Sequence, residues 1–257
     1  MGCVRILAHR GLPTTSYAEN TVPAVLAGLR AGADGAEVDL RLSADGVLVV
    51  CHDMSLRRLT GFPLDVGSTS WPELRAAAAA HEVPLARVED LLQAMHGRPV
   101  VLEVKAPPPA PGAVARTADA VVARLDAVAA AGVPVQVTVS SFAPAVVAAV
   151  RSRASGSSTV RTALLGRPTM RPGSVLRQAL AGGHDEIHPH VGALLAEPRW
   201  VAAAHSCGVG VVAWTVNSRR AVRRLAALGV DAVITDDPRR MRTALPLDDV
   251  VLLRPVG

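Results

Sequence analysis

The feature that most restricts the fold of this chain is a regular alternation of short apolar runs with stretches rich in Ala, Leu and Arg. Apolar runs that alternate with helical segments are typical of parallel strands, each joined to the next by a helix. We expect eight strands, at Val4–Ala8, Gly35–Leu40, Val100–Lys105, Val135–Ser140, Val160–Leu165, Glu186–His190, Val209–Val216 and Ala232–Thr235.

Helices are expected between these runs, at Thr21–Ala31, Val88–Met95, Ala113–Ala131, Pro144–Arg153, Gly173–Ala181, Leu194–Cys207, Ser218–Leu228 and Pro238–Leu245. Eight parallel strands with returning helices close into a (β/α)8 barrel. The sequence therefore predicts an α/β protein of the TIM-barrel type.

The segment after the second strand departs from this alternation. Ser43-Ala44-Asp45-Gly46 contains Asp-Gly, a common hairpin turn, and a further apolar run, Val47–Cys51, follows it. Beyond this run, turn residues and a short polyalanine helix are too irregular for a barrel unit. We therefore expect one domain over residues 1–257, with a small insertion at about 53–84.

The composition excludes several classes of protein. Half of the 257 residues are apolar, but Arg, Asp, Pro or His interrupts each stretch before membrane-spanning length, so no stable membrane insertion is expected. The net charge of +5 comes with few aromatic residues (Phe 2, Trp 3, Tyr 1), so the stacking platforms of proteins that bind single-stranded nucleic acid are missing, and we expect no nucleic-acid partner. No signal peptide pattern precedes the first strand, and we expect a cytoplasmic protein.

The three cysteines predict neither a disulfide framework nor a zinc site. Cys3, Cys51 and Cys207 are odd in number and far apart, without the spacing of metal ligands. We expect all three to be buried thiols.

Acidic residues gather near the expected carboxyl ends of two strands, where the active site of a (β/α)8 barrel lies. Glu37 and Asp39 are two residues apart, so their side chains point to the same face, and Glu103 lies near the end of the next barrel strand. Such carboxylates destabilise a barrel interior unless a cation balances them. Because carboxylates alone suit Mg²⁺ or Ca²⁺ better than Zn²⁺, we predict one divalent cation, Mg²⁺ or Ca²⁺, on these three residues.

Imidazoles and basic side chains are expected beside these carboxylates. His9 and His52 end the first strand and the hairpin, and two imidazoles can act as general base and general acid near neutral pH. Arg10 can bind an anion, and Lys105 is the one lysine in a chain with twenty-six arginines, which suggests a site that requires a compact ammonium. A divalent ion, an Arg and a Lys together stabilise charge on a phosphoryl group. The residues indicate cleavage of a phosphoester.

A set of motifs, in this order, resembles one enzyme family. The motifs are Ala8-His9-Arg10-Gly11, Glu19-Asn20-Thr21, Gly32-Ala33-Asp34-Gly35-Ala36-Glu37-Val38-Asp39, Asp45-Gly46, His52-Asp53, Leu102-Glu103-Val104-Lys105, Ser141-Phe142, Trp214-Thr215-Val216-Asn217 and Gly229-Val230-Asp231-Ala232-Val233-Ile234-Thr235-Asp236. Together they resemble the glycerophosphodiester phosphodiesterase family, and they extend almost to the end of the chain.

The resemblance implies a barrel with a small insertion after its second strand, and an enzyme that hydrolyses glycerophosphodiesters to glycerol 3-phosphate and an alcohol with the help of a metal. It also implies these roles: metal binding by Glu37, Asp39 and Glu103; acid/base catalysis by His9 and His52; phosphate contact by Arg10 and Lys105; support of the site by Asn20; and a substrate border formed by Trp214.

The sequence departs from the family at two places and leaves other functions open. Ala18 stands where the family usually has Pro, and Pro84-Leu85-Ala86-Arg87-Val88-Glu89 only loosely matches the family's usual Pro-Thr-Leu-Glu. The insertion offers only Phe62 and Trp71 as aromatic residues, so no aromatic box for choline is visible. A lysophospholipase D-like enzyme on the same barrel is one alternative, which an apolar tunnel beside the insertion would favour. A barrel that binds a phosphodiester without cutting it is another, against which the intact His9 and His52 argue.

Overall fold

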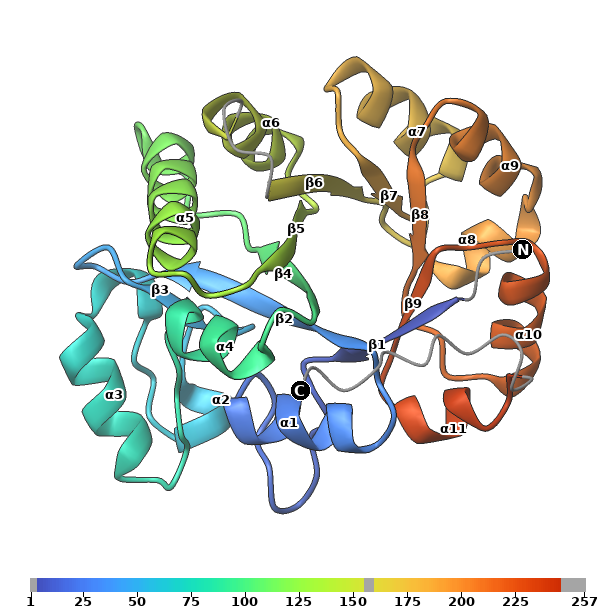
Figure 1. The fold of residues 1–257 in the computed structure, drawn as a ribbon. Coiled ribbons are helices and arrows are strands. Elements are labelled where there is room, and N and C mark those ends of the chain that lie inside the picture. Colours follow the sequence, from blue (N-terminus) through green and yellow to red (C-terminus); the bar gives the residue numbers. More distant parts are fainter. Residues whose placement is uncertain (1–3, 155–159, 246–257) are drawn as a thin grey trace.

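The computed structural model describes residues 4–154 and 160–245, which form a closed parallel barrel surrounded by helices (Figure 1). The barrel strands are β1 (Arg5–His9), β2 (Gly35–Leu42), β4 (Pro99–Val104), β5 (Gln136–Ser141), β6 (Val160–Leu165), β7 (Glu186–His188), β8 (Gly210–Ala213) and β9 (Ala232–Thr235). β1 pairs in parallel with both β2 and β9, so the first and last strands close the ring. The predicted (β/α)8 barrel is confirmed.

Most outer helices agree with the prediction to within three residues at either end. They are α1 (Val22–Arg30), α4 (Val88–Met95), α5 (Ala113–Ala130), α6 (Pro144–Arg153), α7 (Pro172–Ala181), α10 (Arg219–Ala227) and α11 (Pro238–Arg242). Several begin at a side-chain cap: Thr21 accepts a hydrogen bond from Ala24 N, and Ser218 accepts one from Ala221 N. These caps satisfy backbone N–H groups that have no partner in the first helical turn.

The single helix predicted at Leu194–Cys207 is wrong, because the chain forms two helices there. α8 (Val191–Ala196) begins after His190, and α9 (Arg199–Ser206) begins after Pro198. Proline lacks the N–H that a continuous helix needs, and it disfavours helical geometry in the residue before it. The strand predicted at Val209–Val216 is also shorter: β8 ends at Ala213, and Trp214 makes only an isolated bridge to His190.

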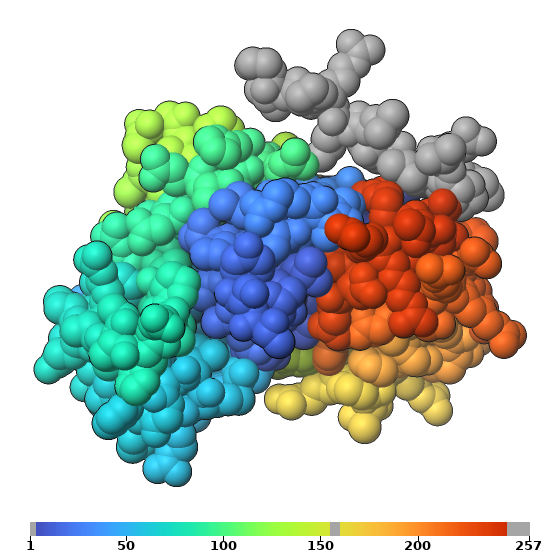
Figure 2. Space-filling view, turned by 90° about the horizontal axis from the view of Figure 1, so that it is seen from below, coloured from blue at the N-terminus to red at the C-terminus, as the bar shows by residue number. Residues whose placement is uncertain are grey.

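The segment between β2 and α4 lies at one side of the barrel, next to the N-terminal segment (Figure 2). It contains β3 (Leu48–Val50), which pairs antiparallel with β2 as the hairpin signal predicts. α2 (Arg57–Thr60), the 3-10 helix η1 (Val66–Ser68) and α3 (Trp71–Ala79) follow, and only α3 was expected. They pack on a small apolar cluster of their own: Val49, Cys51, Leu56, Val66 and Leu74. The division into one domain with an insertion at 53–84 stays a prediction.

An apolar layer inside the barrel supports the residues above it. Leu7, Val101, Val212, Ala232 and Ile234 form one buried cluster in the ring of strands. Because side chains two residues apart point to the same face of a strand, the inward positions that follow Leu7 and Val101 belong to His9 and Glu103. These two polar side chains therefore lie directly above the apolar layer, on the side of the carboxyl ends of the strands. No helix in the described part of the chain is long and apolar enough to cross a membrane.

The prediction of three buried thiols holds for one cysteine. Cys51 is buried in the small cluster beside β3, whereas Cys207 is exposed, because it directly follows α9 where the chain turns at the surface. Cys3 lies outside the described residues.

Candidate active site

Three carboxylates meet at the carboxyl ends of β2 and β4. Asp39 lies beside Glu103 in the parallel register, and Glu37 precedes Asp39 on the same face. Ligand oxygens of Glu37, Asp39 and Glu103 all lie within 4.8 Å of one another, and all three residues are buried. Burial and the charge of Asp39 raise the pKa of Glu37 to about 8. Three buried carboxylates so close together form a donor set that suits a hard divalent cation.

Lys105 directly follows β4 and reaches the same carboxylates. Its Nζ lies 2.7 Å from Asp39 Oδ1 and donates a short hydrogen bond to Glu103 Oε1. Burial acts to lower the pKa of Lys105, but the two carboxylates outweigh it and the pKa is raised, so the ammonium stays charged. Burial likewise acts to raise the pKa of Asp39, but Lys105 and Arg10 lower it below its usual value. Lys105 and Asp39 therefore form a buried ion pair.

Arg10 and Asn20 hold Asp39 from the opposite side. Arg10 Nε lies 3.2 Å from Asp39 Oδ2, and Asn20 Nδ2 donates to the same oxygen at 2.8 Å. Asn20 Oδ1 also accepts from Asp39 N at 3.0 Å, so the amide fixes both the side chain and the backbone. Arg10 (φ 54°) and Asn20 (φ 59°) both adopt left-handed backbone conformations, which are uncommon for residues other than glycine. Such strain concentrates at functional sites.

A carboxylate orients the imidazole of His9. His9 Nδ1 lies 2.6 Å from Asp236 Oδ1, while His9 Nε2 faces Glu37 Oε2 at 3.9 Å. Burial acts to lower the pKa of His9, but the hydrogen bond with Asp236 and the charge of Glu37 raise it. Asn217 fixes Asp236 in turn, because it donates to Asp236 Oδ2 at 2.5 Å and accepts from Asp236 N at 3.0 Å. His9 thus keeps Nε2 turned toward the carboxylates.

His52 is held in a similar way, but from the segment beside the barrel. Its Nδ1 lies 2.7 Å from Asp53 Oδ1. Arg58, from α2, binds Asp53 at 2.6 Å and Glu19 at 2.6 Å, and Glu19 binds Arg10 at 3.0 Å. A chain of ion pairs therefore joins Asp53, the partner of His52, to Arg10 of the carboxylate site.

Trp214 closes one side of the site. It shares a small cavity with other inward-facing side chains: His9, Glu37, Val101, Glu103, Ser140, Leu165, His188 and Ile234. Its indole Nε1 donates to His188 O at 2.8 Å, and the ring of Phe142 meets it edge to face with centroids 5.3 Å apart. The tryptophan is held by both an apolar and a polar contact.

The structure brings most of the predicted site residues together by direct contact. Glu37, Asp39, Glu103, Lys105, Arg10, Asn20 and His9 form one connected group. Trp214 shares their cavity, and His52 joins through Asp53 and Arg58 rather than by a contact of its own. Sequence reasoning missed the roles of Asp236, Asn217, Glu19 and Arg58 in orienting these residues, although Asp236, Asn217 and Glu19 stand in the motifs that carry the resemblance.

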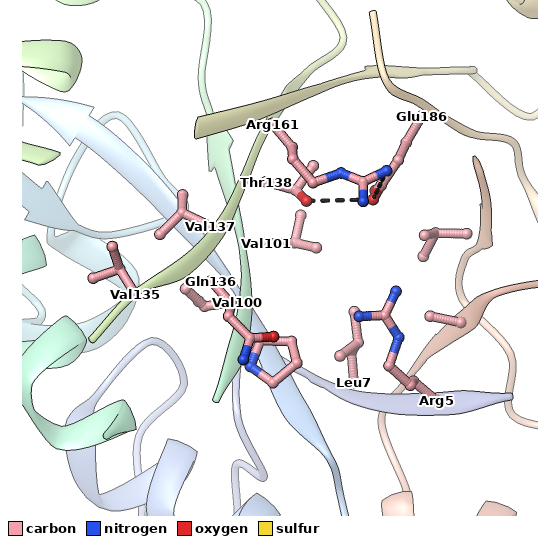
Figure 3. A pocket seen from close by; sticks show the side chains of 13 residues that line it. Arg5, Leu7, Val100, Val101, Val135, Gln136, Val137, Thr138, Arg161 and Glu186 are labelled. Atoms are coloured by element: carbon pink, nitrogen blue, oxygen red, sulfur yellow. Dashed lines mark hydrogen bonds and ion pairs between the residues drawn. The ribbon is translucent and has the colours of Figure 1, made fainter. Parts of the chain in front are cut away.

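A larger cavity, of about 300 Å³, lies at the opposite end of the barrel (Figure 3). Residues near the amino ends of the strands line it, including Arg5 of β1, Arg161 of β6 and Glu186 of β7. It contains none of the predicted site residues. Because barrel enzymes carry their chemistry at the carboxyl ends of the strands, the smaller cavity beside His9 is the better candidate for an active site.

Comparison with known proteins agrees with this geometry. Residues 9–240 match the model of the glycerophosphoryl diester phosphodiesterase family. A glycerophosphodiester phosphodiesterase of Bacillus altitudinis is 28% identical over 247 residues, which cover 92% of this chain and 96% of that protein.

Two solved structures show the same fold. A glycerophosphodiester phosphodiesterase of Thermotoga maritima superposes with a TM-score of 0.77 at 22% identity, covering 95% of this chain and 100% of that one. A phosphodiesterase of Oleispira antarctica, solved in complex with the product sn-glycerol-3-phosphate, also gives a TM-score of 0.77, at 21% identity, covering 94% of this chain and 96% of that one.

Proposed function

The chain belongs to the glycerophosphoryl diester phosphodiesterase family, and we propose that it hydrolyses glycerophosphodiesters to glycerol 3-phosphate and an alcohol. The observation that carries the proposal is the buried group of Glu37, Asp39 and Glu103, with His9, Arg10 and Lys105 around it. Nearly full-length similarity to a glycerophosphodiester phosphodiesterase of Bacillus altitudinis supports the choice of substrate class.

The three carboxylates would hold one divalent cation, Mg²⁺ or Ca²⁺, which supplies Lewis-acid stabilisation of the charge that develops on the phosphoryl oxygens. All three donors are carboxylates, the type of ligand that Mg²⁺ and Ca²⁺ prefer. Asn20 keeps the Asp39 carboxylate in place through two hydrogen bonds.

Arg10 and Lys105 would bind the phosphate. Both cations already lie against Asp39, so an anionic phosphodiester at this point meets two positive side chains held in fixed positions. Prearranged charge of this kind stabilises a transition state without further reorganisation. Trp214 would border the bound substrate, since it lines the cavity that His9 and Glu37 share.

His9 and His52 would transfer the protons. Each imidazole is held at Nδ1 by a carboxylate, Asp236 or Asp53, so Nε2 is the nitrogen left to exchange a proton with a reactant. One histidine would take a proton from the attacking oxygen, and the other would give one to the leaving alcohol.

A lysophospholipid substrate is a second candidate, because a cavity of about 430 Å³ lies beside the inserted segment. Mainly apolar residues line it, among them Leu42, Pro107, Pro108 and Ala113. A neighbouring cavity shares Leu42, Pro107 and Pro108 with it and is lined by Lys105 of the carboxylate site. An acyl chain leaving the site past Lys105 would have an apolar surface to follow.

An assay of several substrates tests the proposal. Glycerophosphoethanolamine, glycerophosphoglycerol and a lysophosphatidylethanolamine would each be incubated with and without a chelator, and phosphorus NMR would identify the products. We expect glycerol 3-phosphate from the glycerophosphodiesters, and its loss with the chelator. Glu37→Gln should abolish turnover, whereas Glu89→Gln, at a half-buried carboxylate of α4 paired with Arg124 of α5, should not. Turnover that survives both the chelator and Glu37→Gln would refute the metal site.

A further inference from the structure

Besides Arg10 Nε, which faces Asp39 Oδ2 at 3.2 Å as an ion pair, two buried polar atoms beside the carboxylate site have no hydrogen-bond partner in the described structure. They are Ser140 Oγ, on β5, and His188 Nδ1, on β7. Both residues are fully buried, with relative exposures of 0%. A buried polar group without a partner costs free energy, and such groups are rare in folded proteins, so each one requires an explanation.

Ser140 and His188 line the same cavity as His9, Glu37 and Trp214. The volume of this cavity is about 20 Å³. A space of roughly 10–15 Å³ on this measure is enough for one water molecule, so the cavity fits one hydroxyl or water but not a phosphoryl group. A substrate phosphate would stay outside it, near Arg10 and Lys105, while a neighbouring part of the substrate reaches in.

Glu186 determines which hydrogen bond His188 can offer. His188 Nε2 lies 2.9 Å from Glu186 Oε2, and Arg161 and Thr138 hold the other carboxylate oxygen at 3.2 and 3.5 Å (Figure 3). Burial acts to raise the pKa of Glu186, but the hydrogen bond with His188 and the positive charges nearby, including Arg161 and Arg5, together outweigh it and the pKa is lowered. The carboxylate is therefore ionised and accepts the hydrogen of His188 Nε2. With Nε2 bonded to Glu186, Nδ1 is the ring nitrogen left without a partner among the described residues, and it can accept a hydrogen bond.

We propose that Ser140 and His188 bind a hydroxyl of the glycerol moiety and so select glycerophosphodiesters over phosphodiesters that lack it. The hydroxyl donates its hydrogen to His188 Nδ1 and accepts a hydrogen bond from Ser140 Oγ. A phosphate oxygen without a hydrogen cannot satisfy Nδ1. This inference rests on the proposed function, and it assigns the specificity to these two residues, with Glu186 as the residue that positions His188.

Substrates that differ by one hydroxyl test the proposal. The parent is glycerophosphoethanolamine, and the analogues are (3-hydroxypropyl)phosphoethanolamine and (2-hydroxypropyl)phosphoethanolamine, which each lack one glycerol hydroxyl. In the wild type we expect one analogue to lose about tenfold or more in kcat/KM, the usual effect of leaving a buried hydrogen-bonding group unpaired. In Ser140→Ala and in His188→Phe the ratio between parent and analogue should fall below about threefold, because the selecting atom is gone.

Ser141→Ala is the matched control. Ser141 adjoins Ser140 but already has partners, since its Oγ donates to Val104 O at 2.7 Å and accepts from Ala143 N at 3.1 Å. We expect this variant to lower the melting temperature and to keep the wild-type discrimination. Ser140→Ala removes a hydroxyl without a partner and should leave the melting temperature unchanged or higher, so loss of discrimination in it cannot come from poor folding.

The outcomes separate the two proposals. If the wild type cleaves both analogues with the same kcat/KM as the parent, the hydroxyl site is refuted and the proposed function stands. The hydroxyl site is also refuted if discrimination between parent and analogue survives in both Ser140→Ala and His188→Phe. In that case a bound water satisfies the two atoms. A wild type that does not cleave the parent refutes the proposed function and this inference with it.

Discussion

Lys105 Nζ and Asp39 Oδ1 lie 2.7 Å apart in the interior of the barrel, so the one lysine of the chain neutralises one member of the carboxylate group. If a compact ammonium is needed there, Lys105→Arg should lower kcat/KM by about tenfold or more although the charge is kept, because a planar guanidinium does not fit the same space. Lys105→Met should be worse, since both Asp39 and Glu103 lose the ammonium that pairs with them. Steady-state kinetics of both variants decide the matter: wild-type activity in Lys105→Arg would show that any cation suffices.

The raised pKa of Glu37 predicts how the stability of the metal-free protein depends on pH. Between the usual pKa of 4.5 and the folded-state value of about 8, the folded protein binds a proton that the unfolded chain releases. Stability should therefore fall as the pH rises through this window, by up to about 1.4 kcal/mol per pH unit from this group. Thermal unfolding in a chelator at pH 5, 6, 7 and 8 measures the slope. Glu37→Gln should show a smaller slope, and an equal slope would contradict the assigned pKa.

Removal of either imidazole should reveal how the proton transfers are divided. His9→Ala and His52→Ala should each lower kcat by about 10²- to 10⁴-fold, and the double variant should be little worse than the slower single one. A p-nitrophenyl ester, whose leaving group needs no proton, should restore activity only in the variant that lacks the general acid. Full activity of His52→Ala on glycerophosphoethanolamine would remove that residue from the mechanism.

The carboxylate behind His9 should matter for rate more than for binding. Asp236→Asn keeps the shape of the side chain but no longer holds the His9 ring in one tautomer, so kcat should fall by about 10²-fold or more with a small change in KM. Asp236 helps to raise the pKa of His9. In Asp236→Asn, the apparent pKa of His9 in the pH profile of kcat should therefore be lower than in the wild type. Asp231→Asn is the matched control, at a carboxylate bonded to His205 away from the site. An unchanged pH profile in Asp236→Asn would exclude the role.

The barrel and the carboxylate cluster could be predicted because both depend on local pattern. The spacing of Glu37 and Asp39 alone places the two carboxylates on one face, and strand alternation brings Glu103 beside them. The break between α8 and α9 was missed because the flanking residues favour helix, although Pro198 marks it. The partner of His9 was missed for a different reason. Asp236 lies 227 residues from His9 in sequence, and only closure of β9 onto β1 brings them together.

Arg58 belongs to α2, in the segment outside the regular barrel, yet its guanidinium bridges Asp53 and Glu19. An enzyme in which this segment is exchanged for another would lose the ion pairs that Arg58 makes with Glu19 and with Asp53, the residue bonded to His52. The new segment would have to supply a cation at the same point. Libraries that diversify this segment should therefore keep Arg58 constant.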